Sequence, residues 1–551
     1  MFSNNMFERF SIPKLIEIIG ESKLEQISGA LELLNLEHHS GGEVYTKGFL
    51  SNFATKTIGY EYINSIIGFN AIFETLNLDE AKQHLGSSRH GVTKQECLAN
   101  ALVLFKAKSK RKELFESMGI HFEDTAYSVT SMDLPAFVSL GKTSSPYKPL
   151  KDYQFEVYFQ ALDCLKIDYS RFILQMPTGS GKTRTAMEII TSYINTYPDA
   201  SVVWLAHSTE LCDQAAECFL EVWPHVATKE LNFQRYYSLY NFTFGGDAKV
   251  NFLCTSFQSA YALISKDGSF FNSKLHKKRL IVVDEAHKVI APTYKAVTQA
   301  LQCEGTQIMG LTATPGRKYT EFNTDDENME LSKYFFEKII SFDPRGKEAI
   351  EYLREKGVLA NAKSEILTVN SDINLSPKEL QQVSDLFEIP ASILNKIGKS
   401  SIRNAEILAK LKQLISTNTA RSIIFFGTSV EHSVLICSLL KFLDIKAEHV
   451  DGRTPRAMRE NIIFRFRNQE INVLCNYEVL STGFDAPKVD CVFLARPTAS
   501  VVLYSQMIGR GLRGPAIGGK ESCLIINVKD NFINLPSIEK MYKVFEDYWL
   551  Y

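Results

Sequence analysis

The sequence predicts an α/β protein in which two tandem parallel-sheet domains follow a mostly helical N-terminal domain. Three patterns predict this architecture. Leucine and isoleucine recur at helical spacing before about residue 145, short apolar runs alternate with helical patterns from about residue 150, and a second alternating block begins near residue 422. Alternation of this kind is typical of βαβ units, whose parallel sheet is covered by helices on both faces.

Three segments of the N-terminal region have helical patterns. Pro13–Leu34 and Tyr60–Leu78 carry apolar residues at helical spacing, and Thr93–Met118 begins with Thr-Lys-Gln-Glu, a capping-box pattern. The stretch Lys142–Pro149, rich in Ser, Lys, Pro and Tyr, suggests a domain boundary. We expect a helical accessory domain over residues 1–145, a first α/β domain over 146–340 and a second over 341–551.

Ten apolar runs are short enough to be buried strands. The first block contains Arg171–Met176, Ser201–Ala206, Asn251–Thr255, Leu280–Val283 and Gln307–Leu311. The second contains Ser422–Phe426, Ala447–Val450, Asn472–Cys475, Cys491–Leu494 and Cys523–Val528. Residues 318–420 between the blocks are less regular, with a helical pattern around Lys378–Leu414.

Composition places few limits on function. The 551 residues carry a formal net charge of −2, which argues neither for nor against nucleic acid as a partner. None of the ten cysteines forms a C-x-x-C pair, so we expect a reduced, cytoplasmic protein without a zinc site. Met1–Phe10 has no apolar core and no run approaches 18 apolar residues, so we expect neither a signal peptide nor a membrane span.

A strand, a glycine-rich turn and a helix follow one another over residues 171–194. In the turn, Gly179 and Gly181 let backbone N–H groups approach phosphate oxygens, and the helix N-terminus adds partial positive charge. Lys182 can reach the β- and γ-phosphates and Thr183 can bind Mg²⁺. We expect ATP to bind here, although the chain has Met176 where the general pattern has glycine. The expected nucleotide-binding residues of the turn are Pro177, Thr178, Gly179, Ser180, Gly181, Lys182 and Thr183.

Two adjacent carboxylates end a later strand. Leu280–Val283 is followed by Asp284, Glu285, Ala286 and His287. Because ligands bind beyond the carboxyl ends of parallel strands, Asp284 is placed to hold Mg²⁺ and Glu285 to orient and deprotonate an attacking water.

Together with these motifs, further segments resemble superfamily 2 helicases and translocases of the DEAH type, over about residues 150–530. The segments are Leu150–Gln154, Val203–Leu211, Thr255–Ser259, Leu311–Pro315, Ile423–Thr428, Ser481–Pro487 and Gln506–Arg513. Thr-Gly-Phe-Asp-Ala-Pro and Gln-x-x-Gly-Arg-Gly-Leu-Arg are most similar to the branch that holds XPB, RadD and restriction-enzyme translocases, and Arg496–Ser500 strengthens the likeness to RadD.

This resemblance implies two RecA-like domains with ATP between them. Arg510 and Arg513, three residues apart on an expected helix, would both reach the γ-phosphate from the second domain. Gln506 would complete the nucleotide network, and His287 would connect the ATP site to Thr312 or Thr314. Gln154 would contact the adenine, and Gly483 and Asp485 would position the second domain on the nucleotide.

The same resemblance implies contacts to a phosphate chain that do not read base sequence. The candidates are His207, Ser208, Thr255, Ser256, Gln258, Thr428 and Thr482. For each, a capping or strand-end role remains an equal alternative.

We therefore expect an ATP-dependent DNA helicase or translocase, acting in repair or in restriction and antiviral defence. An RNA helicase of the same superfamily, or a nucleotide-gated DNA-binding subunit of a larger defence complex, remains an alternative. Residues 1–145 lie outside this resemblance and are expected to contact a protein partner or an unusual DNA structure.

Overall fold

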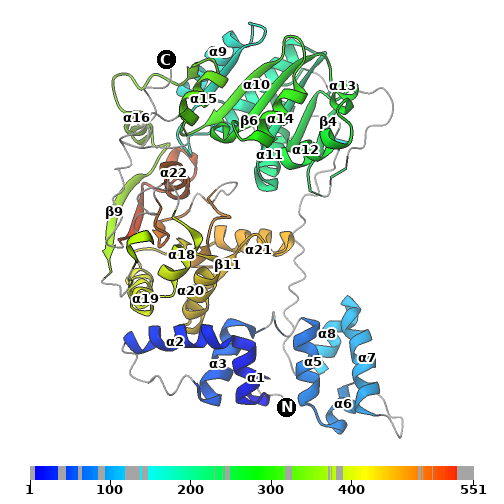
Figure 1. Ribbon diagram of the computed structural model, residues 1–551, viewed down its shortest axis with the longest axis vertical. Helices are drawn as coiled ribbons and strands as arrows, with labels where there is room; N and C mark the ends of the chain where they lie inside the picture. The colour runs from blue at the N-terminus through cyan, green and yellow to red at the C-terminus, as the bar shows by residue number, and fades with distance from the viewer. Residues whose placement is uncertain are drawn as a thin grey trace.

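The computed structural model describes residues 6–34, 45–59, 62, 65–84, 93–117, 137–138, 147–228, 230–238, 240–241, 249–316, 326–369, 373, 375–379, 389–481, 486, 488–498 and 500–529. They form two parallel sheets covered by helices, with further helices at the N-terminal end (Figure 1). The predicted fold class is confirmed. In the part of the chain so described, none of the helices has the length and hydrophobicity that crossing a bilayer requires.

The N-terminal region is helical wherever it is described before residue 118. Its helices are α1 (Ile12–Ile19), α2 (Glu21–Leu33), α3 (Lys47–Thr57), α5 (Ile66–Thr75), α6 (Leu78–His84), α7 (Lys94–Lys106) and α8 (Lys108–Ser117), after a short 3₁₀ turn at Met6–Arg9. Gly20, with φ of +92°, separates α1 from α2 where one helical pattern was predicted. The predicted capping box is present at α7: Thr93 Oγ1 accepts from Glu96 N at 3.3 Å, and Glu96 Oε2 accepts from Thr93 N at 2.8 Å.

The first sheet has the strand order β1-β4-β5-β3-β6-β7-β2-β8. Its strands are β1 (Phe137–Val138), β2 (Arg171–Gln175), β3 (Ala200–Ala206), β4 (Phe233–Tyr236), β5 (Phe252–Ser256), β6 (Lys278–Asp284), β7 (Gln307–Thr312) and β8 (Ile339–Ile340). All neighbours pair in parallel except β1 and β4. One face packs on α9 (Asp152–Cys164), α10 (Lys182–Thr196) and α11 (Thr209–Val226). The other packs on α12 (Phe257–Lys266), α13 (Phe270–Lys274), α14 (Pro292–Leu301) and α15 (Asp326–Tyr334).

The second sheet is parallel throughout, with the order β11-β12-β10-β13-β14-β9. Its strands are β9 (Asn361–Thr368), β10 (Ile423–Phe426), β11 (Ala447–Val450), β12 (Val473–Asn476), β13 (Cys491–Leu494) and β14 (Ser522–Lys529). Helices α21 (Arg456–Arg467) and α22 (Val501–Ile508) cover one face, and α19 (Ser401–Ser416) and α20 (Val430–Phe442) cover the other. Two shorter helices, α16 (Ala349–Glu355) and α18 (Ala391–Gly398), complete this part.

All ten predicted strands are present, and four strands were not predicted: β1, β4, β8 and β9. The edge strand β9 alternates between exposed and half-buried residues, so it has no apolar run by which to recognise it. β1 lies within the range expected to be helical and adds to the first sheet through β4. The boundaries at 145 and 340 remain proposals; the first sheet ends at Ile340 and the second begins at Asn361.

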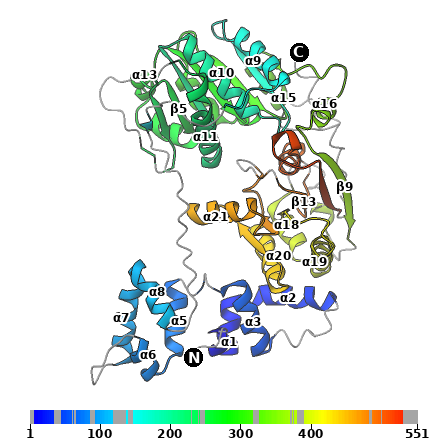
Figure 2. The same ribbon diagram turned by 180° about the vertical axis from the view of Figure 1, so that it is seen from behind.

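Helices α2 and α3 of the N-terminal region pack against the second sheet's domain, and both views place α1–α3 beneath α19 and α20, with α5–α8 to their side (Figures 1 and 2). α2 contacts α19 and α3 contacts α20. Phe49 and Phe53 from α3 lie 5.1 and 5.4 Å, between ring centroids, from Phe442 of α20, and Lys56 pairs with Asp444 at 2.7 Å. One hydrophobic core runs from these helices into β10 and β12. The two regions therefore stabilise each other.

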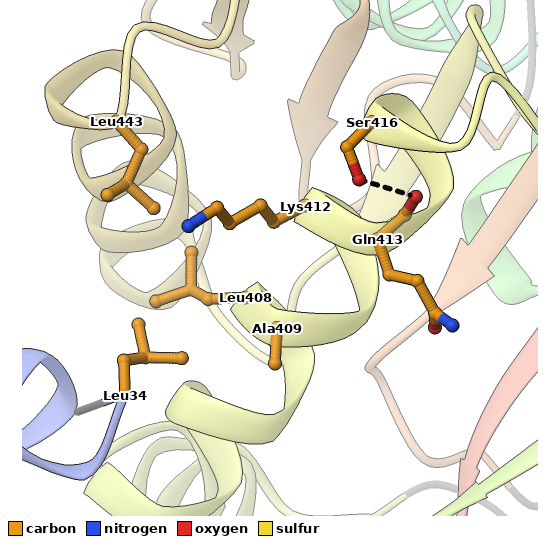
Figure 3. A pocket seen from close by; sticks show the side chains of 7 residues that line it. All are labelled: Leu34, Leu408, Ala409, Lys412, Gln413, Ser416 and Leu443. Carbon is orange, nitrogen blue, oxygen red and sulfur yellow. Dashed lines mark hydrogen bonds between the residues drawn. The ribbon is translucent and has the colours of Figure 1, made fainter. Parts of the chain in front are cut away.

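A pocket of about 330 Å³ remains where α2 ends against α19 (Figure 3). Leu34, Leu408 and Leu443 line it, and the side chain of Lys412 extends between Leu443 and Leu408. Ser416 donates a hydrogen bond to the carbonyl of Gln413 at its rim, at 3.1 Å. The pocket belongs to the junction between the N-terminal helices and the second sheet.

Candidate active site

The glycine-rich turn lies between β2 and α10 as predicted. Gly179 and Gly181 have φ of +91° and +88°, so both use the left-handed conformation that glycine tolerates best. Ser180 N and Oγ both donate to the carbonyl of Pro177, at 3.1 and 2.7 Å, which closes the turn. α10 begins at Lys182 and runs for 15 residues, so its N-terminus points its free N–H groups into the turn. The geometry is that of an anion-binding loop.

Two side chains of α9 hold this loop from behind. Tyr153 Oη donates to the carbonyl of Ser180 at 2.7 Å, and Gln154 Nε2 donates to the carbonyls of Ser180 and Gly181 at 3.4 Å. Gln154 Oε1 in turn accepts from Lys151 N at 2.9 Å. The structure thus gives Gln154 a second task besides the expected adenine contact, because its amide supports the phosphate loop itself.

The predicted carboxylates end β6 at the same sheet edge. Asp284 is buried and its Oδ1 accepts from Glu285 N at 3.0 Å. Glu285 has φ of +50°, which is unusual outside glycine and costs about 1–2 kcal/mol. β7 separates β6 from β2, so the acids and the phosphate loop face one crevice at the carboxyl edge.

The pKa values of the two carboxyl groups shift in opposite directions. Burial, and then the neighbouring charge of Glu285, raise the pKa of Asp284. Burial also acts to raise the pKa of Glu285, but nearby basic groups led by Lys182 outweigh it and lower that pKa. A divalent cation beside Asp284 would favour its carboxylate form, as Mg²⁺ binding requires.

His287 connects these acids to the segment after β7. Its Nδ1 lies 3.3 Å from Thr312 Oγ1 and 3.4 Å from Glu285 Oε2. Thr312 Oγ1 donates to the carbonyl of Thr314 at 2.8 Å. Burial lowers the pKa of His287 to about 3, so the imidazole is neutral at physiological pH. The contact expected between His287 and Thr312 is present, and its role in coupling remains a proposal.

The second domain reaches the phosphate loop through the segment after α22. A Cβ built on Gly179 would lie 3.1 Å from Arg513 Nη1 and 3.3 Å from Leu359 Cδ2, and one built on Gly509 would lie 2.4 Å from Thr178 Cγ2. Arg513 is therefore placed against the loop. Gln506 is buried, and within the described structure its Nε2 has no hydrogen-bond partner.

The prediction that Arg510 and Arg513 share a helix is wrong. α22 ends at Ile508, and Arg513 forms an isolated bridge with Leu359. The chain turns because Gly511 approaches β14 and β13 so closely that a Cβ there would lie 2.3 Å from Cys523 Sγ. Arg510 Nε donates back to the carbonyl of Gln506 at 3.2 Å. The two arginines thus have different surroundings.

Ion pairs also join the two sheets' helices, and the sequence did not indicate them. Arg459 of α21 pairs with Glu210 of α11, and Arg456 lies 3.3 Å from Asp213. Tyr237 donates to the same Asp213 at 2.9 Å. Side-chain charges at these positions carried no motif, so only the folded arrangement identifies the pairs.

In the first domain, most expected nucleic-acid contacts have structural partners. Ser208 and Ser256 cap α11 and α12 with their hydroxyls, and Thr255 is buried and donates to the carbonyl of Tyr236 at 2.7 Å. Gln258 donates to the carbonyl of His207 at 3.2 Å. Burial lowers the pKa of His207 to about 4. The capping alternative therefore holds for both serines.

In the second domain, Thr428 is buried beneath α18. Its Oγ1 lies 3.1 Å from His432 Nδ1, and a Cβ on Gly398 would lie 2.4 Å from that oxygen. Its hydroxyl therefore does not face a phosphate chain. Thr482, Gly483 and Asp485 lie outside the described residues.

The residues present fit a nucleoside triphosphate and Mg²⁺. Gly179 leaves open a space facing Arg513 that a Cβ would occupy, and the buried Nε2 of Gln506 is a donor without an acceptor among the described residues. Thr183 and Asp284 would hold Mg²⁺, which would neutralise the developing charge on the phosphates.

Comparison with known proteins matches the two sheets to two family models. Residues 147–317 match the model of the type III restriction enzyme res subunit, and residues 406–514 match the helicase conserved C-terminal domain. The matched segments contain the phosphate loop, the β6 acids and most of the segment around Arg513.

Individual relatives are distant. The protein of Saccharomyces cerevisiae named "Putative ATP-dependent helicase IRC3" is 24% identical over 401 residues, which are 71% of this chain and 52% of that protein. A type I restriction enzyme EcoAI endonuclease subunit of Escherichia coli is 24% identical over 429 residues, covering 73% and 48%. This chain thus spans about half the length of these relatives. The type ISP restriction-modification enzyme LlaBIII bound to DNA has a TM-score of 0.48 at 18% identity, covering 73% of this chain and 29% of that one.

Both sheet domains are matched in order, and the relatives include proteins named as a helicase and as a restriction-enzyme subunit. The chain belongs to superfamily 2 of the helicases, in the branch that includes the motors of restriction enzymes.

Proposed function

We propose that this protein is an ATP-dependent DNA helicase or translocase that couples Mg-ATP hydrolysis to movement along DNA. The contact of Arg513 with the phosphate loop at Gly179 carries the proposal, because it brings a cation of the second domain to a phosphate site of the first. A triphosphate bound by both domains favours their closure, and its hydrolysis lets them reopen.

Each residue has a distinct task in this proposal. Lys182 and the N-terminus of α10 bind the β- and γ-phosphates, and Glu285 takes the proton of the attacking water. Arg513 stabilises the charge spread over the transferred phosphoryl oxygens, an effect worth about 10³–10⁵ in rate in other nucleotide hydrolases. Bound Mg²⁺ supplies charge neutralisation between the β- and γ-phosphates.

DNA is the proposed track, in repair or in restriction and antiviral defence. The match of residues 147–317 to a restriction-enzyme subunit supports DNA over RNA. The proposed protein partner of residues 1–145 would bind through α5–α8, because α2 and α3 pack on α19 and α20.

ATP hydrolysis measured alone and then with single-stranded DNA, duplex, forked DNA or RNA tests the proposal. We expect stimulation by DNA, and its loss in Lys182→Ala and Glu285→Gln. Stimulation by RNA alone would make the protein an RNA helicase, and equal hydrolysis with and without every nucleic acid would refute the motor. Nucleotide-dependent DNA binding without hydrolysis would identify a gated subunit instead.

A further inference from the structure

Arg496 is a buried cation that the nucleotide site does not use. It follows β13 by two residues, and its side chain is 7% exposed. Among the described residues, neither Nε nor Nη1 has a hydrogen-bond partner, although both atoms are buried. A buried donor without an acceptor is destabilising, and more so when it is charged, so this environment is incomplete for a guanidinium.

The contacts that Arg496 does make leave its charge largely uncompensated. Its Cζ lies 4.3 Å from the ring centroid of Tyr477, a cation–π arrangement that holds the guanidinium plane in place. The carboxylate of Glu478 lies 4.0 Å from Nη1 and is itself 58% exposed. At that distance, and with its carboxylate mostly in solvent, Glu478 compensates the charge of Arg496 only weakly.

The surroundings add positive charge. Arg403, also buried, donates through Nη2 to the carbonyl of Ala495, the residue before Arg496, at 2.6 Å. His432 is neutral, because burial and then the charge of Arg403 lower its pKa to about 3. Arg403 therefore brings a second cation to the backbone directly before Arg496.

That end of the sheet is where a ligand is expected. Tyr477 follows β12 and Arg496 follows β13, and β10 lies between these strands in the sheet. All three strands are parallel, so both side chains come from the carboxyl edge, where open α/β sheets bind ligands. Thr428, expected to contact nucleic acid at the same edge, is covered by α18.

We propose that Arg496, oriented by Tyr477, binds a backbone phosphate of the nucleic-acid strand on the second domain. A phosphodiester oxygen supplies the acceptor that the buried guanidinium needs. The guanidinium is planar and weakly hydrated, which favours hydrogen bonds to phosphate oxygens. The inference rests on the proposed function. It assigns a phosphate contact of the second domain to a cation, where hydroxyl groups were expected.

The test measures the affinity of the full chain for a short labelled single strand over a range of salt concentrations. Arg496→Ala should weaken binding about 10- to 100-fold at low salt. It should also lower the slope of log affinity against log salt by about 0.7, the value for one lost contact to a single strand. Arg496→Lys should keep the slope and lose part of the affinity.

Arg421→Ala is the matched control. Arg421 is an exposed arginine that precedes β10 at the opposite, amino-terminal edge of the same sheet, so affinity and slope should stay at wild-type values. Binding of a fluorescent ATP analogue should be unchanged in every variant. If Arg496→Ala does not fold, Arg496→Gln removes the charge with less loss of volume and should show the same slope.

The outcomes separate the two proposals. A wild-type slope in Arg496→Ala or Arg496→Gln would overturn the phosphate contact and leave the motor standing. Failure of the wild-type protein to bind DNA and RNA would overturn both.

Discussion

Arg513 lies against Gly179 of the phosphate loop, 3.1 Å from the position that a Cβ on that glycine would occupy. The two residues come from different α/β domains, so this contact exists only when the domains are closed on each other. We expect Arg513→Ala to retain ATP binding but to lower the hydrolysis rate about 10³-fold or more, because a charged donor to the phosphoryl oxygens is lost. Single-turnover hydrolysis and nucleotide affinity, measured together, separate these effects. As a control, Arg421→Ala should hydrolyse ATP at the wild-type rate. A rate near wild type in Arg513→Ala would show that Arg513 does not contribute to hydrolysis.

Gly181 cannot be replaced without disturbing the loop. Its φ is +88°, and a Cβ would lie 2.5 Å from Gln154 Nε2. Gly346 has φ of +76° with nothing within 4 Å of a Cβ. Alanine at either position should cost about 1–2 kcal/mol of stability through backbone strain. Only Gly181→Ala should also lose nucleotide affinity, about ten-fold or more, as measured by titration with an ATP analogue. Equal nucleotide affinity in both variants would contradict a role for Gly181 in shaping the phosphate loop.

The ion pair between Asp213 and Arg456 should favour domain closure. Arg456→Glu places like charges together across the junction and should lower the DNA-stimulated rate about two- to five-fold, the range expected for a partly exposed pair. Combining it with Asp213→Lys should recover most of the rate. Arg465→Glu, on the same helix but paired with Glu448 and Glu470 of its own domain, is the control for charge on α21. No recovery in the double variant would argue against the pair.

Phe53 joins the N-terminal helices to the second sheet. It is fully buried and stacks with Phe49 at 5.9 Å between ring centroids, beside Phe442. We expect Phe53→Ala to lower the free energy of unfolding by about 3–5 kcal/mol, because it leaves a cavity in the shared core. Denaturant unfolding should show the loss in the transition of the second domain as well. Val103→Ala, at an exposed position of α7, should change stability by less than about 0.5 kcal/mol.

His432 should make stability depend on pH. Burial lowers its pKa to about 3, below the value near 6.5 of an unfolded chain. Between these two values the unfolded state binds the extra proton, so stability is full above pH ~6.5 and falls as the pH decreases toward 3. Denaturant unfolding at neutral and mildly acidic pH should show a smaller difference in His432→Gln than in the wild type. An identical difference would assign the acid sensitivity to other groups, such as His207 and His287.

The sequence alone was sufficient to predict the elements that are specified by contiguous residues. A phosphate loop is contiguous, and its glycines, lysine and following helix predict their own geometry, which the positive φ of Gly179 and Gly181 confirms. Buried parallel strands are short apolar runs, so all ten predicted strands were found, whereas β9 was missed because an exposed edge strand needs no such run. The carboxylates of Asp284 and Glu285 could be placed because they end a recognisable strand.

Only the tertiary structure decided what depends on packing between distant segments. The close approach of Gly511 to Cys523 ends the helix before Arg513, and no local pattern contains that contact. The same holds at the carboxyl edge of the second sheet. Thr428 is buried under α18 there, and Nε and Nη1 of Arg496 have no hydrogen-bond partner among the described residues, and neither local segment predicts this. Sequence by itself determined which chemistry the chain carries. The packing of the two domains decided which side chains lie at the nucleotide site or at the carboxyl edge of the second sheet. These positions depend on contacts between segments that are distant in the sequence.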